Sequence, residues 1–226
     1  VNFTEEVEAY SYFHSWTLDR SQVPSSIYVG GQELEGGNGG TAYAVTGADG
    51  SVSTEGASAD QYQIAWDGQT LTLRNAVITQ GSHWDAAIYY DMGDLTVRLE
   101  GENTVAGPSG GSYSSGLLVW GNLTFEGTGS LHASGGAVED SGSKAEAQSY
   151  GIELYESLTI SGGTVTAAGG TATVEGESSY GRSDGIYIEN AMTVTGGTVT
   201  ATGGTVTAEG AESKAGSNGI LVGEMT

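Results

Sequence analysis

The chain has 226 residues, 39 of them glycine and none cysteine, so a disulfide framework is excluded. Its 28 acidic and 6 basic residues give a formal net charge of −22 at pH 7. That charge argues against nucleic acid, whose phosphates are bound by Lys and Arg, and against an anionic membrane surface. No apolar stretch is long enough to span a membrane. The Gly-, Ser- and Thr-rich, Lys-poor composition favours an extracellular or cell-surface location.

Residues 1–60 lack the repeat that fills the rest of the chain, and we expect them to form an N-terminal cap with lead-in strands. Residues 26–29, followed by a Gly-Gly pair, predict a strand and a turn. Aromatic and apolar residues three positions apart are compatible with a short amphipathic helix or with a strand: Val7, Tyr10, Phe13 and Trp16. We expect this segment to cover the open end of a stack of strands.

A repeat dominates residues 61–226. Residues 151–167 and 185–201 share one pattern at an offset of 34 residues: Gly-Ile, an apolar-Thr-apolar triplet, and Gly-Gly-Thr-Val-Thr-Ala. A looser copy starts at Gly116 and a further one opens at Gly219. The triplet also recurs upstream, at 71–73 and 95–97. A period of this length indicates structural units that stack on one another.

Each unit alternates apolar and polar residues in short runs, which predicts three short strands separated by Gly-Gly corners. We therefore predict an all-β fold, a right-handed parallel β-helix (solenoid) with about 34 residues per coil, over residues 61–226 and ending in an incomplete coil. A β-sandwich is the alternative, but it needs no fixed long period. The predicted inward columns are Ile88, Leu117, Ile152, Ile186, Ile220 and Leu71, Leu95, Leu123, Leu158, Met192; the predicted outward column is Thr72, Thr96, Thr124, Thr159, Thr193.

The repeat resembles a known family. Residues 158–166 and 192–200, each introduced by Gly-Ile, are similar to the carbohydrate-binding right-handed parallel β-helix family of surface proteins from Gram-positive anaerobes. Residues 27–31 and 66–73 resemble its lead-in segments, and the resemblance covers about two-thirds of the chain. It implies a right-handed β-helix, calcium, and binding of cellulose-like or acidic polysaccharides. No single set of binding residues transfers by motif.

Four aromatic residues at outward positions of the Gly-Ile strands form the candidate carbohydrate site: Tyr89, Trp120, Tyr155 and Tyr187. Stacked on one face, they would make a strip that a glycan could follow, because the strand spacing is close to the length of one sugar ring. The alternative is that Tyr and Trp simply favour strand surfaces. An enzyme is not expected, because the Gly-His-Gly and Arg-x-Lys motifs of β-helix pectin hydrolases are missing from the sequence.

A calcium site is possible at acidic loop positions. Glu175 and Glu209 lie 34 residues apart, and Glu139 and Asp140 lie in the corresponding earlier loop. Stacked carboxylates repel one another unless a cation intervenes, and calcium accepts flexible oxygen ligands. Solvated acidic loops are the alternative.

The two ends of the chain suggest self-association. An N-terminal segment could dock head-to-tail on the last coil of a neighbour; the alternative is a chain cut before further domains. The candidate contact residues are Phe3, Tyr10, Phe13, Trp16, Ile220 and Val222. The leading hypothesis is a non-catalytic extracellular polysaccharide-binding module. The second is a structural subunit that stacks end to end into a filament or surface array.

Overall fold

The computed structural model describes residues 24–81 and 83–223, and within these ranges every regular element is a β-strand. The strands form four sheets of seven, eight, five and three strands. The described residues contain no helix that could cross a membrane.

Hydrogen bonding between neighbours sets the order of the strands in each sheet. The seven-stranded sheet contains β2 (Gln32–Gly36), β1 (Ser25–Val29), β8 (Ala86–Tyr90), β11 (Tyr113–Val119), β15 (Glu146–Leu154), β19 (Tyr180–Ile188) and β23 (Lys214–Val222). The eight-stranded sheet contains β20 (Met192–Val194), β16 (Leu158–Ile160), β12 (Leu123–Gly127), β9 (Leu95–Glu100), β6 (Thr70–Arg74), β5 (Ile64–Trp66), β3 (Ala42–Thr46) and β4 (Val52–Ser53). The five-stranded sheet contains β21 (Thr198–Thr202), β17 (Thr164–Ala168), β13 (Ser130–Ser134), β10 (Glu102–Ala106) and β7 (Val77–Ile78). The three-stranded sheet contains β14 (Val138–Ser141), β18 (Thr171–Glu175) and β22 (Thr205–Glu209).

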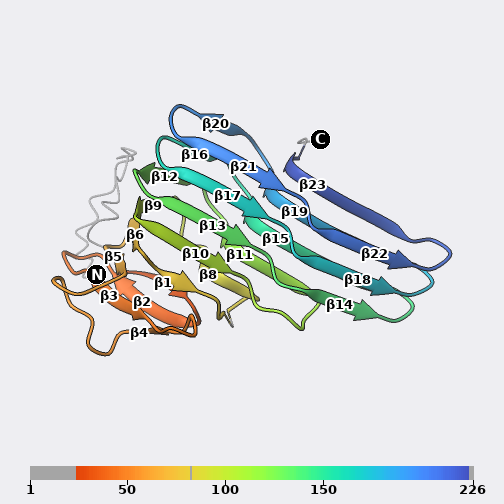
Figure 1. Cartoon of the computed structure of the whole chain (residues 1–226), viewed down its shortest axis with the longest axis horizontal. Helices are drawn as coiled ribbons and strands as arrows, with labels where there is room; N and C mark the ends of the chain where they lie inside the picture. The colour runs from red at the N-terminus through yellow and green to blue at the C-terminus, as the bar shows by residue number, and fades with distance from the viewer. Residues whose placement is uncertain (1–23, 82, 224–226) are drawn as a thin grey trace, which may run out of the picture.

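Successive repeat units lie side by side with their equivalent strands paired in parallel, as Figure 1 shows from green through cyan to blue. Ile152 pairs with Ile186, and Ile186 pairs with Ile220, so the predicted stacking of this column is confirmed. A unit such as residues 146–175 gives one strand to each sheet, in the order β15, β16, β17, β18. The fourth strand, at Thr171–Glu175, was not predicted, although it alternates apolar and polar residues like the others.

The predicted right-handed parallel β-helix is wrong. The chain forms four sheets, two of which mix parallel and antiparallel pairs, and no closed solenoid is present in the described residues. β1 pairs antiparallel with both β2 and β8, and β5 pairs antiparallel with both β3 and β6. The local cause is tight turns: Gly30 and Gly31 both have positive φ (57° and 78°), which suits a two-residue hairpin turn. This turn explains the antiparallel pairing of β1 with β2, the strand that follows it directly.

The predicted column that begins at Leu71 is displaced at β6, which pairs antiparallel with β5 and parallel with β9. Leu71 pairs with Val97 rather than with Leu95, and Thr72 pairs with Arg98 rather than with Thr96. The displacement is two residues, so each side chain keeps its face of the sheet. From Leu95 onward, the column Leu95, Leu123, Leu158, Met192 is paired as predicted.

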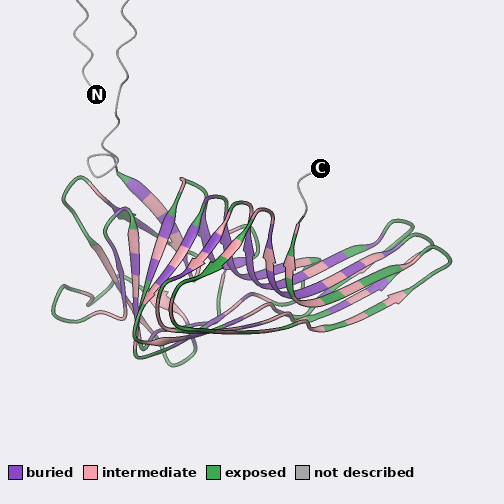
Figure 2. Cartoon of the chain, turned by 90° about the horizontal axis from the view of Figure 1, so that it is seen from above, coloured by how far each residue is buried: buried purple, intermediate pink, exposed green. Residues whose placement is uncertain are grey.

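Two hydrophobic cores lie behind the seven-stranded sheet. The larger core takes buried residues from the seven-, eight- and five-stranded sheets. The smaller core packs the first half of β15 against the three-stranded sheet and consists of Val138, Ala145, Ala147, Ala172 and Val174. Buried and half-buried positions alternate along many strands, and the loop tips are exposed (Figure 2). The long strands of the seven-stranded sheet therefore span both cores.

Buried serines join the seven-stranded sheet to the corners between the five- and three-stranded sheets. The Ser149 hydroxyl donates to the Gly136 carbonyl oxygen (2.7 Å) and accepts from the Gly170 amide (3.0 Å). The hydroxyl of buried Ser183 repeats the donation one unit later, and that of Ser217, which is exposed in the last unit, repeats it two units later, each at 2.7 Å. A buried hydroxyl needs such partners, so the serines and the corner backbone satisfy one another.

The last unit lacks a following strand in the described residues. Val194, Ile220 and Val222 are 52%, 43% and 41% exposed, whereas Ile186, directly before Ile220 in its column, is 0% exposed. The same side chain is thus a core residue in one unit and a surface residue in the next.

This contrast gives a matched test of the packing. Ile186→Ala should lower the free energy of unfolding by about 2–5 kcal/mol, because it leaves a cavity in the core. Ile220→Ala should cost clearly less, because much of its side chain already meets water. Urea unfolding of the two variants measures the difference, and equal losses would contradict the stacking described above.

Candidate functional site

The outward face of the seven-stranded sheet, over β8, β11, β15 and β19, gathers aromatic and acidic side chains, and we call it the aromatic face. Its shape depends on Gly151. Ser149 and Ile152 both point inward although they are three residues apart, so Tyr150 and Glu153 both point outward. A Cβ on Gly151 would lie 2.8 Å from both the backbone N and the backbone O of Ala168, and only glycine fits there.

The four predicted carbohydrate residues lie on the aromatic face in two columns. Tyr89 and Tyr187 share one column, with Leu118 and Glu153 between them in register. Trp120 and Tyr155 lie next to each other in the neighbouring column, with ring centroids 4.9 Å apart. The strip is therefore not continuous.

The four aromatic residues differ in exposure. Tyr89 is 3% exposed and packs in a small cluster with Ala86 and Leu118, whereas Trp120 is 48% exposed. Tyr155 and Tyr187 are half-buried. Trp120 therefore exposes its ring to a ligand, whereas Tyr89 is covered by its neighbours.

Glu153 is a functional candidate that the sequence did not single out. Its side chain is 3% exposed, and its carboxylate oxygens accept hydrogen bonds from the hydroxyls of Ser115 (2.9 Å) and Tyr155 (3.4 Å). Burial raises the pKa of Glu153 to about 8, against opposing contributions from the Tyr155 hydrogen bond and the Arg182 charge. Most of the Glu153 carboxyl population is therefore protonated at neutral pH.

Burial also raises the tyrosine pKa values on this face. The pKa of Tyr155 rises to about 12, first through burial and then through the neighbouring Glu153 carboxylate. The pKa of Tyr89 likewise rises to about 12 through burial and Asp91. Both phenols remain neutral hydrogen-bond donors over the physiological range.

A polar group lies on β19 beside the aromatic residues. Arg182 donates from Nε to the Asp184 carboxylate, and its guanidinium carbon lies 4.5 Å from the centroid of the Tyr187 ring. Asp184 is 0% exposed and also accepts from the amide and the side chain of Asn218 (2.9 and 2.8 Å). The buried Nη2 of Arg182 has no hydrogen-bond partner among the described residues. The Arg182 guanidinium thus lies over the Tyr187 ring, and its Nη2 group is left without a hydrogen-bond partner among the described residues.

The aromatic face extends toward β1. His83 stacks on Tyr28 with ring centroids 3.7 Å apart, and Trp84 stacks on Tyr89 at 6.2 Å. Trp84 is 62% exposed and has a positive φ of 51°, as has Asp85. Such backbone conformations are uncommon for residues with a side chain and often occur at functional sites. Trp84 is a second exposed ring that the sequence analysis did not select.

The predicted calcium residues are only partly brought together. Glu175 pairs with Glu209 across neighbouring strands, as their spacing predicted, but Glu139 pairs with Thr173. Asp140 accepts hydrogen bonds from the amides of Ser141 and Glu146, each at 2.8 Å. Across residues 24–81 and 83–223, no group of three or more His, Asp or Glu side chains could hold a metal ion. Calcium stays a prediction.

The predicted self-association residues divide into two groups. Phe3, Tyr10, Phe13 and Trp16 lie outside the described residues. Ile220 and Val222 lie on β23, at the exposed edge of the last unit.

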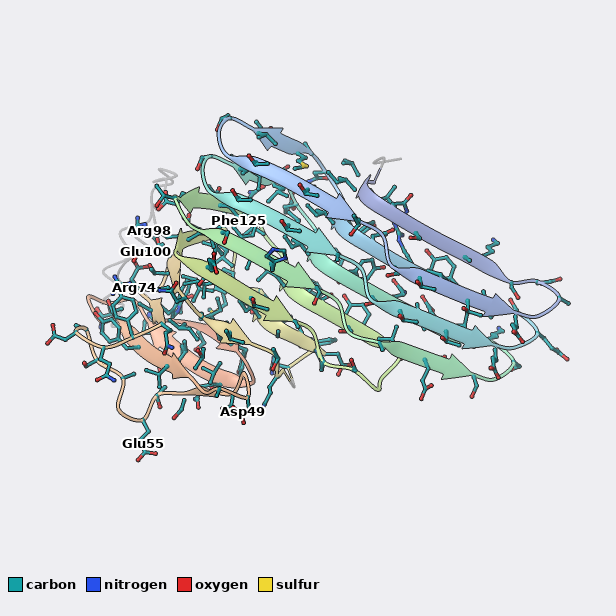
Figure 3. The ribbon with its side chains drawn as sticks, in the orientation of Figure 1. Asp49, Glu55, Arg74, Arg98, Glu100 and Phe125 are labelled. Carbon is teal, nitrogen blue, oxygen red and sulfur yellow. The ribbon has the colours of Figure 1, made fainter. Side chains whose placement is uncertain are left out.

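The opposite side of the molecule carries paired charges. Arg74 bonds to Glu100 (2.8 Å) and Arg98 to Glu126 (2.7 Å), each across two neighbouring strands of the eight-stranded sheet. Figure 3 shows Arg74, Arg98 and Glu100 grouped on the same part of the ribbon. These arginines are already engaged with carboxylates, so this surface offers little free positive charge to a ligand.

Comparison of the chain with family models, with curated proteins and with solved structures gave no match in any of the three. The family resemblance inferred from the repeat therefore stays a prediction, and the function is argued from the aromatic face itself.

Glu153 should make the free energy of unfolding fall as the pH rises. Its folded-state pKa of about 8 lies above the ordinary value of 4.5, so the folded protein binds this proton more tightly than the unfolded chain. The contribution of Glu153 is full below about pH 4.5 and is lost as the pH rises through 8, a change on the order of 5 kcal/mol. Glu153→Gln should remove this dependence, as measured by urea unfolding at several pH values. A variant whose pH dependence equals that of the wild type would contradict the burial of an ionisable carboxyl here.

Proposed function

We propose that this protein is a non-catalytic, extracellular polysaccharide-binding module whose binding site is the aromatic face. One observation carries the proposal: Trp120, 48% exposed, lies against Tyr155 on the outward face of the seven-stranded sheet. Pyranose rings have apolar C–H faces that pack well on aromatic rings. Sites for small polar ligands combine such apolar surfaces with a few placed polar groups.

The surroundings of Trp120 and Tyr155 supply those polar groups. Asp91 and Glu189 lie in the same column of outward residues as Trp120 and Tyr155. Asp91 is exposed and Glu189 is half-buried. Their carboxylates can accept hydrogen bonds from sugar hydroxyls. Neighbouring strands lie about 4.7–4.9 Å apart, close to the length of one sugar ring, so an extended glycan could follow the stack.

Two acids of the aromatic face, Glu153 and Asp184, are too buried to act on a glycosidic bond. Glycoside hydrolysis generally uses two carboxyl groups that flank the scissile bond. Glu153 and Asp184 are 3% and 0% exposed, and each is engaged by neighbouring side chains. Neither carboxyl group is presented to a glycosidic oxygen.

The binding proposal is tested by truncating the open aromatic pair. Trp120→Ala combined with Tyr155→Ala should reduce retention on insoluble cellulose or on a polygalacturonate gel at least about tenfold, equivalent to roughly 1.4 kcal/mol. The matched control is Tyr43→Ala with Tyr62→Ala, which removes another pair of half-buried rings, 5.3 Å apart, from the N-terminal region. Depletion of the protein from solution by each polysaccharide measures both, with circular dichroism as the check on folding. Equal retention by the two double variants would argue against the aromatic face as the site.

A second candidate function is end-to-end assembly of copies of this chain. The observation that favours it is the exposed edge formed by β20, β21, β22 and β23, where Val194, Ile220 and Val222 occupy positions that earlier units bury. An unpaired strand edge with apolar side chains is a template for pairing with another chain. We propose that a second copy of the chain docks head-to-tail on this edge.

Light scattering tests the assembly. Wild-type protein should increase in mass with concentration, and Ile220→Lys with Val222→Lys should remain monomeric, because the added charges repel a docking strand. His132→Lys places one lysine on an exposed position of β13, away from the edge, and serves as the control for each single variant, Ile220→Lys and Val222→Lys. A wild-type protein that stays monomeric at high concentration would contradict this candidate and leave the binding proposal untouched.

A further inference from the structure

Four residues form one row across the aromatic face, with an acid at each end and two rings between them. The row runs Asp91, Trp120, Tyr155, Glu189, and each of the four directly follows its strand. The amides of Trp120, Tyr155 and Glu189 each donate to the carbonyl oxygen of the last residue of the preceding strand, at 3.0, 3.2 and 3.1 Å. Neighbouring strands lie about 4.7–4.9 Å apart, so the two acids flank the ring pair at the distance of one strand on either side.

The carboxylates of Asp91 and Glu189 have no counter-ion among the residues that the structure describes. Every ion pair within residues 24–81 and 83–223 joins an arginine to a different acid: Arg74–Glu100, Arg98–Glu126 and Arg182–Asp184. Asp91 accepts one hydrogen bond, from the Tyr89 hydroxyl at 3.1 Å, which engages one of its two oxygens. Asp91 is exposed and Glu189 is half-buried, so a ligand lying on the rings can reach both carboxylates.

The surrounding face is short of positive charge. Arg182 is the one basic residue within β8, β11, β15 and β19, and its guanidinium group is bonded to Asp184. Burial, and after it the charge of Glu189, raises the pKa of the Tyr187 hydroxyl, so the field of this carboxylate reaches the neighbouring ring. The whole chain carries a net charge of −22. A polyanionic ligand would therefore meet like charge at this face, whereas a cationic ligand would be attracted to it.

Aromatic rings flanked by carboxylates suit a sugar that carries a protonated amino group. The C–H face of such a sugar can stack on Trp120 or Tyr155 like that of any pyranose, and aromatic ring faces also attract ammonium groups. The ammonium group donates charge-assisted hydrogen bonds to a carboxylate, which are stronger than those of a neutral hydroxyl. A neutral glucan makes only the stacking contact and weaker hydrogen bonds, and the carboxylates of a polyuronate are repelled.

We propose that the aromatic face selects a polysaccharide of amino sugars whose amino groups are free and protonated. Trp120 and Tyr155 are the stacking platform, and Asp91 and Glu189 bind the ammonium groups of the sugars on either side. This ligand class rests on the proposed function, because it is assigned to the same site. It differs from the cellulose-like or acidic polysaccharides that the family resemblance implies.

Four insoluble polymers separate the ligand classes: chitin, fully deacetylated chitin, cellulose and a polygalacturonate gel. At about pH 5.5 the amino groups of deacetylated chitin carry protons, and exposed carboxylates are largely ionised. Depletion of the wild-type protein from solution should show at least about tenfold tighter binding to deacetylated chitin than to chitin or cellulose. Binding to polygalacturonate should be the weakest. Chitin is the matched ligand, because acetylation removes the charge and keeps the polymer backbone.

Two double variants separate the site from the net charge of the chain. Asp91→Asn with Glu189→Gln should weaken binding to deacetylated chitin about tenfold and leave binding to chitin nearly unchanged. Glu175→Gln with Glu209→Gln removes two exposed carboxylates from the three-stranded sheet, so it changes the net charge equally and should keep the wild-type preference. Circular dichroism checks folding, and the single variant Asp91→Asn, at an exposed position, decides if the first pair fails to fold.

The outcomes distinguish this ligand class from the proposed function. Equal binding to chitin and deacetylated chitin, or tighter binding to polygalacturonate, overturns the amino-sugar ligand and leaves a polysaccharide-binding module. Equal losses in the two double variants overturn it too, because binding would then follow net charge. Short lysine oligomers that displace the protein as well as glucosamine oligomers with the same number of amino groups would show general attraction to cations, with the same consequence. Absence of binding to all four polymers overturns both proposals.

Discussion

Parallel pairing in register between equivalent strands is the constraint on which this structure depends. Because Ile152, Ile186 and Ile220 are direct neighbours, every other position of the unit also meets its equivalent in the next unit. Inward columns become continuous core, and outward columns become continuous surface. A change at one position of the unit is therefore felt by the units on both sides.

The register also explains how an outward face can bury polar groups. An outward side chain on a flat sheet normally meets water, but here tyrosine rings from neighbouring strands cover the spaces between columns. Tyr150 is 1% exposed and Glu153 is 3% exposed for this reason. The seven-stranded sheet consequently has a hydrophobic core behind it and a second, mixed aromatic and acidic layer in front. The second layer thus holds a buried acid, Glu153, among aromatic side chains.

The sequence predicted those parts of the fold that depend on the repeat. The spacing of Gly-Ile and apolar-Thr-apolar motifs was sufficient to place Ile152 next to Ile186 and Leu158 next to Met192. It was insufficient for β1 to β6, where tight turns produce antiparallel hairpins that the motif does not encode. The Leu71 displacement arose at this junction, because a match of three residues can slip by two without changing faces.

The sequence predicted which residues of the candidate site point outward, but not which of them are covered by residues of other strands. Alternation was sufficient to assign Trp120 and Tyr155 to the outward face, but not to show that Tyr89 is covered by its neighbours. Glu153 was visible as an outward acid. Its burial depends on rings from other strands, and its partner Ser115 lies 38 residues away in the sequence. The hydrogen bonds between the serines of the seven-stranded sheet and the corner glycines also join residues that are distant in the sequence.

The claim that the aromatic face is the binding surface is tested most directly by hydroxyl-radical footprinting with mass spectrometry, with and without bound polysaccharide. Bound polysaccharide should protect Trp120 and Tyr155 from oxidation, whereas the reference pair Tyr43 and Tyr62 should react equally in both samples. Protection confined to other residues, with Trp120 and Tyr155 oxidised to the same extent in both samples, would contradict it.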